Sequence, residues 1–217
     1  MFHVCHNQEQ TNASDRLSKV SSFIVVLQFR FQSSYTPEDV VCIDESNVPF
    51  RGHLSFRQYT PNKRHRYGIK VFQLCVAGGQ TWTLKVYAGK EKTHEIAVSE
   101  KVGIELMDGF LDSGRTLYTD NWYTSVSLSK TLIGRKTHLV GTLRLNRKLN
   151  PPDVVNAKLK EGEVRALQNK DKTIVLKWKD KIDVLMLSTM HDGPMETYLD
   201  RGKEVSKPSV VLEFNKS

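Results

Sequence analysis

The pattern of apolar and polar positions changes several times along the chain, and each change predicts a different element. Between Asp15 and Phe31 apolar residues recur at intervals of three and four, as in an amphipathic helix, although the β-branched run 24–26 weakens that prediction. The elements predicted after it are a strand ending at Asp44, strands over 67–76 and 82–87, a helix over 97–111, a strand ending at Asp120, a helix capped by Ser125 and a strand over 138–145. This order predicts an α/β (α+β) fold in which helices flank a mixed sheet.

Two aspartates, Asp44 and Asp120, lie where a short apolar strand gives way to polar residues. A strand that ends in this way delivers its carboxylate to the rim of a sheet, where a metal ion can reach it. Two such strands side by side would place the two residues about 5 Å apart in backbone spacing. That spacing suits two divalent cations held about 4 Å apart, as in enzymes that cut and join phosphodiesters. On spacing alone, two aspartates at strand ends are more often carboxylates that cap turns than metal ligands.

The residues around both aspartates form blocks that occur in a fixed order. The blocks are Ile43-Asp44-Glu45-Ser46, Phe50-Arg51-Gly52, Phe56-Arg57-Gln58-Tyr59, Pro61-Asn62-Lys63, Tyr67-Gly68-Ile69-Lys70, Thr119-Asp120-Asn121-Trp122-Tyr123-Thr124-Ser125 and Val140-Gly141-Thr142-Leu143-Arg144. They resemble the blocks around the first two catalytic aspartates of piggyBac transposases, and the chain is most similar to the vertebrate genes domesticated from that transposon. The resemblance covers residues 15 to 217. It implies an RNase H-like fold whose first and fourth strands are neighbours, and an ancestral DNA strand cleavage and transfer with Mg²⁺ or Mn²⁺ held by Asp44 and Asp120.

The resemblance also implies a third catalytic aspartate, on a helix that follows a motif like Tyr-Asn-Lys. The corresponding segment here is 210–217, and the third aspartate is expected a few residues beyond Ser217. We therefore expect a truncated form without strand cleavage, for which Asp192, Asp200 and Glu213 are weak candidates as replacement ligands. A domesticated, non-catalytic DNA-binding or chromatin-associated module is the alternative from another class. A product without a stable fold is the third hypothesis.

The same comparison divides the chain into segments. Residues 1–14 are expected to form a disordered lead, 15–150 the RNase H-like core, 151–208 a β-rich insertion, and 209–217 the truncated end of the core. Within the last two segments, strands are predicted over 172–178, 182–188 and 210–214.

The net charge of +8 and the pI of about 9.3 suit a polyanionic partner. One basic cluster follows Asp44 in a predicted hairpin, and there phosphate contact and an ordinary solvated surface are equally good explanations. The candidate phosphate contacts are Arg51, Arg57, Lys63, Arg64, Arg66 and Lys70. We expect weak, salt-sensitive binding of DNA, because phosphate contacts carry no base information. Trp122 and Tyr123 can stack on a base, but packing beneath the helix at Ser125 is the favoured interpretation.

Other classes of function find little support in the sequence. The longest apolar run, Phe23 to Leu27, is far too short to span a bilayer, and the N-terminus does not resemble a signal peptide. The three cysteines are too few and too scattered for a disulfide framework, so Cys42 and Cys75 are interpreted as small buried apolar residues and Cys5 as part of a frayed terminus. A nuclear or nucleocytoplasmic protein is expected, with a homodimer left open by the resemblance.

Overall fold

The structure is a computed structural model that describes residues 15–61, 63–89, 97–192, 195–200 and 203–216; the predicted lead over 1–14 lies outside them. Its helices are α1 (Ser21–Ser34), α2 (Val98–Leu106), α3 (Val126–Gly134), α4 (Pro152–Val155) and α5 (Ser209–Phe214), with a 3₁₀ turn over Ala77–Gly79. Its strands are β1 (Val40–Pro49), β2 (Gln58–Tyr59), β3 (Tyr67–Val76), β4 (Gln80–Val86), β5 (Thr116–Thr119), β6 (His138–Thr142), β7 (Val164–Gln168), β8 (Ile174–Lys179), β9 (Asp183–Ser188), β10 (Met195–Asp200) and β11 (Lys203–Pro208).

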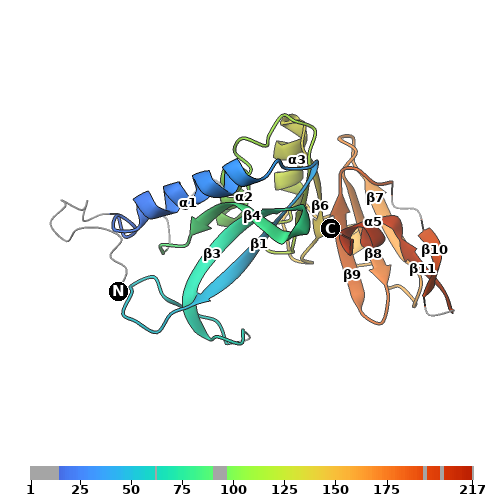
Figure 1. Cartoon of the computed structure of the whole chain (residues 1–217). Helices are drawn as coiled ribbons and strands as arrows, with labels where there is room; N and C mark the ends of the chain where they lie inside the picture. Colours follow the sequence, from blue (N-terminus) through green and yellow to red (C-terminus); the bar gives the residue numbers. More distant parts are fainter. Residues whose placement is uncertain (1–14, 62, 90–96, 193–194, 201–202, 217) are drawn as a thin grey trace.

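Nine strands form one mixed sheet in the order β2-β3-β1-β5-β6-β9-β8-β7, with β4 paired to β3. The central strands β1, β5 and β6 run parallel, and every other neighbour in the sheet is antiparallel. Strands β10 and β11 form a separate hairpin, which projects at the right end of the molecule in Figure 1. The expected mixed sheet is therefore confirmed, including the side-by-side placement of the strands that precede Asp44 and Asp120.

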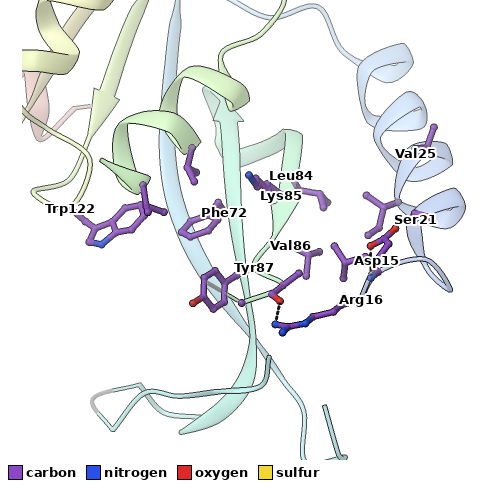
Figure 2. A pocket seen from close by; sticks show the side chains of 16 residues that line it. Asp15, Arg16, Ser21, Val25, Phe72, Leu84, Lys85, Val86, Tyr87 and Trp122 are labelled. Carbon is purple, nitrogen blue, oxygen red and sulfur yellow. Dashed lines mark hydrogen bonds between the residues drawn. The ribbon is translucent and has the colours of Figure 1, made fainter. Parts of the chain in front are cut away.

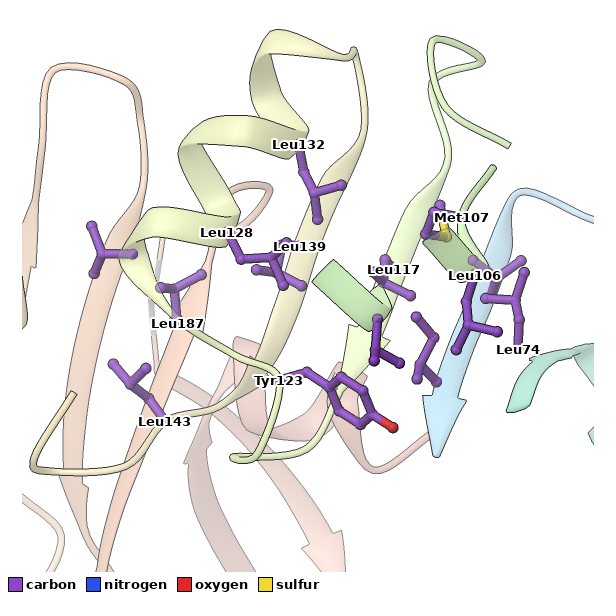
Figure 3. Packing of buried hydrophobic residues seen from close by; sticks show 14 of the residues in the cluster. Leu74, Leu106, Met107, Leu117, Tyr123, Leu128, Leu132, Leu139, Leu143 and Leu187 are labelled. Carbon is purple, nitrogen blue, oxygen red and sulfur yellow. The ribbon is translucent and has the colours of Figure 1, made fainter. Parts of the chain in front are cut away.

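Two hydrophobic clusters cover the two faces of this sheet. Leu117 of β5 and Leu139 of β6 belong to the larger cluster, which also contains buried residues of α2 and α3 (Figure 3). Tyr118 and Val140, the next residue on each strand, belong to the smaller cluster together with Val210 of α5. Because successive side chains of a strand point to opposite faces, α2 and α3 lie on one face and α5 on the other.

Several elements differ from the predictions. The helix at the start begins at Ser21 rather than Asp15, because the Asp15 side chain accepts a hydrogen bond from the backbone N–H of Leu17 (2.8 Å) within a turn. No residue of α1 is buried, and Phe23 of the predicted apolar stripe is 51% exposed. Elements α4, β7, β10 and β11 were not predicted, since their short segments carry no clear apolar period.

Residues 210–214, predicted as a strand, form helix α5. The pair Val210-Val211 favours a strand by propensity, but Pro208 immediately precedes the helix and both valines pack on the sheet. Strand β1 also runs on to Pro49 instead of ending at Asp44, because its antiparallel pairing with β3 continues to Pro49 and Gly68. Parallel pairing with β5, in contrast, ends at Ile43 and Thr119.

Candidate metal centre and nucleic-acid interface

Asp44 and Asp120 occupy adjacent positions at the rim of the parallel part of the sheet. The last pair in the parallel register joins Ile43 of β1 to Thr119 of β5, and each aspartate is the next residue of its chain. Neighbouring strands lie about 4.8 Å apart. The topology thus brings together two residues that are 76 positions apart in the sequence, as the spacing argument predicts.

The alternation of side chains directs both aspartates to the face of the sheet that carries α5. Cys42 and Tyr118, two residues before Asp44 and Asp120, belong to the cluster that α5 completes. The ring of Phe214 at the end of α5 lies 6.2 Å from the ring of Tyr118. Asp44 is exposed and Asp120 is partly exposed. Both residues therefore meet solvent on the face of the sheet that carries α5.

The backbone around each aspartate is fixed by local hydrogen bonds. Asp44 Oδ1 accepts from the N–H of Glu45 (2.7 Å), and Asp120 Oδ1 accepts from the N–H of Trp122 (2.9 Å). The fully buried Thr124 donates through Oγ1 to the carbonyl of Asp120 (2.7 Å) and lies 2.8 Å from Thr119 Oγ1. These bonds leave lone pairs on both carboxylates free for a cation, since a carboxylate has about four acceptor positions.

Two arginines beyond β6 hold the loop that follows Asp120. Arg144 Nε donates to the side-chain oxygen of Asn121 (2.9 Å), and Arg147 Nη2 donates to the carbonyls of Asn121 (3.4 Å) and Trp122. Burial, and then the charge of Arg144, lower the pKa of Arg147. These two roles were not predicted from the sequence, because a cluster of basic residues carries no signal for a contact with a loop 23 to 26 positions away.

The opposite face beneath the aspartates is closed by an aromatic cluster. Trp122 stacks on Phe72 with ring centroids 5.3 Å apart, and Tyr123 is completely buried. Burial, and then the charges of Glu45 and the two aspartates, raise the pKa of Tyr123 above its ordinary value. Packing beneath the helix, the favoured interpretation of the two aromatic residues, is therefore confirmed for Tyr123, and Trp122 is partly buried in the same cluster.

The six basic candidates divide into two groups. Lys70 forms an ion pair with Glu45 (3.3 Å) and lies over the rings of Phe72 and Trp122, on the face away from Asp44. Arg57 donates to the carbonyls of Arg51 and Gly52 (3.0 Å each) and so stabilises its own loop. The remaining four side chains are exposed in the loops that join β1 to β2 and β2 to β3: Arg51, Lys63, Arg64 and Arg66.

The model of the Transposase IS4 family matches residues 1–217. The chain belongs to this family. Human PiggyBac transposable element-derived protein 2 is 24% identical over 232 residues, which cover 97% of this chain and 38% of the human protein. A piggyBac transposase solved by cryo-EM in a synaptic complex with hairpin DNA is similar with a TM-score of 0.80 and 27% identity, over 93% of this chain and 42% of that one.

These similarities confirm the resemblance to piggyBac proteins and the RNase H-like fold. The chain is a transposase-derived domain of the piggyBac type, and it spans about two fifths of the length of the relatives it matches. Members of this transposase family typically use a divalent metal ion. No helix in the described parts of the chain has the length and apolar character that crossing a membrane requires.

In this piggyBac-type domain, two residues carry donor atoms that suit such an ion, Asp44 and Asp120. Carboxylate oxygens are the ligands that Mg²⁺ prefers, and Mg²⁺ is commonly held by one or two of them together with water and phosphate oxygens. Among the described residues, no group of three His, Cys, Asp or Glu side chains is placed to hold a metal ion. Of the weak candidates for a third ligand, Glu213 instead pairs with Lys216 (2.8 Å), and its pKa is lowered by that contact.

A cavity of about 860 Å³ lies away from Asp44 and Asp120. Figure 2 shows it between α1 and β4, with Arg16 donating to the carbonyl of Ala88 (2.7 Å) on one side and Trp122 on the other. Its lining includes Ile24, Val25, Leu84 and Val86, and neither aspartate contributes to it. We therefore place the candidate metal centre at the exposed rim and not in this cavity.

Proposed function

We propose that this chain supplies a divalent-metal site and a DNA-contacting surface to a transposase-derived protein. The observation that carries the proposal is the position of Asp44 and Asp120, one residue beyond the last parallel pair of β1 and β5. The similarity to a piggyBac transposase solved with hairpin DNA supports a nucleic-acid partner.

Asp44 and Asp120 would hold Mg²⁺ or Mn²⁺ through their carboxylate oxygens. Such an ion stabilises negative charge on a phosphate and activates water for attack on it. The chain's own contribution is to fix the two carboxylates: the β1–β5 register sets their spacing, and Thr124 together with Arg147 fixes the backbone after Asp120. Because two carboxylates are fewer than such sites normally use, we expect binding of metal and DNA without strand cleavage.

Binding of Mn²⁺, followed by isothermal titration calorimetry, tests the metal site. Asp44→Asn and Asp120→Asn should each weaken binding by about tenfold, or about 1.4 kcal/mol. Glu45→Gln is the matched control, because it removes a neighbouring carboxylate that pairs with Lys70 on the opposite face. Circular dichroism checks that each variant is folded. Equal weakening by all three substitutions, or by none, would refute the assignment.

Cleavage of a labelled duplex with transposon-like ends is measured with the same proteins in Mg²⁺ or Mn²⁺. The expected result is no product above background. Cleavage that Asp44→Asn or Asp120→Asn abolishes would show that the chain is catalytic and that a further residue completes its metal site.

DNA binding is proposed for the exposed basic residues of the loop between β2 and β3. Lys63, Arg64 and Arg66 lie within four positions, and their charges can contact phosphates without reading bases. Replacing all three by Gln should weaken binding to a labelled duplex and reduce the slope of log K against log salt by about 3, since each lost phosphate contact lowers it by about 0.9. The matched control replaces Lys160, Lys170 and Lys181, which are exposed at the other end of the sheet. Identical slopes for both triple variants would contradict the proposal.

A nuclear location is part of the same proposal, because DNA is the proposed partner. Imaging of the fluorescently tagged chain checks it, and exclusion of the tag from the nucleus would count against it.

A further inference from the structure

Cys42 and Cys75, 33 positions apart in the sequence, face each other across β1 and β3. Both were interpreted from the sequence as buried apolar residues, but the structure leaves both half-buried and pairs them directly in the antiparallel register. Both cysteines are free thiols. That interpretation is corrected for a physical reason: strand pairing is a long-range property that spacing along the chain does not show.

The backbone geometry at this pair suits a covalent bond between the two sulfur atoms. Directly opposite residues of antiparallel strands have Cα atoms about 4.5–5.5 Å apart. Disulfides span Cα separations of about 4.4–6.8 Å. Both side chains lie on the same face, since opposite residues of paired strands point the same way. Neither strand has to move far for the bond to form.

Thr81 and Gln73 are the neighbours of Cys75 in the sheet. Thr81 of β4 is the partner of Cys75 in the β3–β4 register. Gln73 Nε2 donates to Thr81 Oγ1 (2.9 Å), which joins β3 to β4 beside Cys75. Because both cysteines are half-buried, a small oxidant can reach them from solvent.

We propose that Cys42 and Cys75 form a redox-active dithiol that converts reversibly to a cross-strand disulfide. With a small disulfide such as oxidised glutathione, one protein thiolate attacks a sulfur of the oxidant and releases one glutathione thiolate. The second protein thiol then attacks the protein sulfur of this mixed disulfide, forms the Cys42–Cys75 bond, and releases the second glutathione thiolate while its proton goes to solvent. Two protein thiols are oxidised, and one glutathione disulfide is reduced to two thiols.

The position of the pair gives the disulfide a structural consequence. Asp44 follows Cys42 by two residues on the same face of β1, and Gln73 is opposite Asp44 in the register. The bond would therefore fix β1 to β3 immediately beside the rim that carries Asp44. The proposal itself stands on the strand register and does not depend on metal or DNA binding by this chain.

Peptide mapping of the unaltered 217-residue chain tests the proposal. The protein is incubated with oxidised glutathione at pH 8, free thiols are blocked with iodoacetamide, and the chain is digested with trypsin without reduction. Trypsin places Cys5 in peptide 1–16, Cys42 in 31–51 and Cys75 in 71–85, so that each pairing gives a distinct mass. The expected product is 31–51 linked to 71–85, formed at a rate unchanged by about tenfold dilution of the protein and lost after dithiothreitol.

Two single variants serve as controls for the chemistry. Cys42→Ser and Cys75→Ser should each stop at a mixed disulfide with glutathione on the remaining cysteine. Recovery of 31–51 and 71–85 separately from the unaltered protein, each alkylated or each carrying its own glutathione, would overturn the proposal. A link from either peptide to 1–16 as the main product would overturn it as well.

Discussion

Replacement of Gly141 by alanine tests whether tight packing between β5 and β6 sets the position of Asp120. A Cβ atom built on Gly141 lies 2.3 Å from Thr124 Oγ1 and 2.4 Å from the carbonyl oxygen of Thr119. Real Cβ atoms essentially never approach a neighbour within 3.0 Å, so both oxygen atoms must move by at least about 0.6 Å. Thr119 directly precedes Asp120, and Thr124 bonds to its carbonyl.

Overpacking of this kind costs about 1–3 kcal/mol. We expect Gly141→Ala to lower the free energy of unfolding by about 2 kcal/mol, measured by urea denaturation with circular dichroism. The same displacement should weaken Mn²⁺ binding about tenfold, because it shifts the Asp120 carboxylate relative to Asp44.

Gly103→Ala is the matched control for that substitution. Gly103 is also buried, but it lies within α2, and a Cβ there would meet Leu128 Cδ2 at an ordinary 3.8 Å. Removing a helical glycine should raise stability by about 0.5–1 kcal/mol. A free energy of unfolding for Gly141→Ala within about 0.5 kcal/mol of that of the unaltered protein would refute this prediction, since substitutions at exposed surface positions have effects of that size.

Three further substitutions probe other contacts, each followed by urea denaturation. Lys177 is 5% exposed and donates to the carbonyls of Val155 (3.0 Å) and Ala157 (2.8 Å). Lys177→Met should therefore lower the free energy of unfolding by about 2–4 kcal/mol. Lys170→Met, at an exposed position, should leave it unchanged. Ser125 caps α3 and donates to the buried Glu100 carboxylate (2.7 Å). Ser125→Ala should therefore lower the free energy of unfolding by about 2–3 kcal/mol, and Ser125→Thr should lower it clearly less. Equal losses for the two substitutions would contradict the role of the hydroxyl. Burial lowers the pKa of His191 below 6.5, so the unfolded chain takes up this proton more readily, and stability should fall as the pH drops through 6.5 toward the folded pKa. His191→Gln should reduce that loss between pH 7.5 and 5.5, and an unchanged loss would show that other groups cause it.

The sequence predicted well those features that depend on neighbouring residues. The apolar runs before Asp44 and Asp120 predicted the two strands that pair as β1 and β5, while their side-by-side placement was implied by the resemblance to piggyBac transposases. Ser125 was predicted as a helix cap, and its hydroxyl accepts from the N–H of Leu128 (2.9 Å). In each case the signal lies within a few positions of the residue concerned.

The sequence could not predict contacts that the three-dimensional arrangement alone creates. Arg147 reads as one more surface charge, yet it bonds to the loop after Asp120. Lys70 reads as a phosphate contact, yet the alternation along β3 directs it to Glu45. Helix α5 was mistaken for a strand because a run of five residues fits either period. These features depend on register and packing between segments far apart in the chain.

The alternation along β1 and β5 also decides where further ligands of the proposed metal centre can come from. Ile43 belongs to the cluster under α2 and α3, and the next position on that face, Glu45, is engaged by Lys70. Asp44 and Asp120 point the other way, toward the face on which Tyr118 meets Phe214 of α5. A third protein ligand must therefore approach from the side of α5, while groups on the α2 and α3 face can act on the site only by positioning the strands. The same geometry explains why Asp44→Asn and Glu45→Gln, one residue apart, are expected to differ in their effect on metal binding.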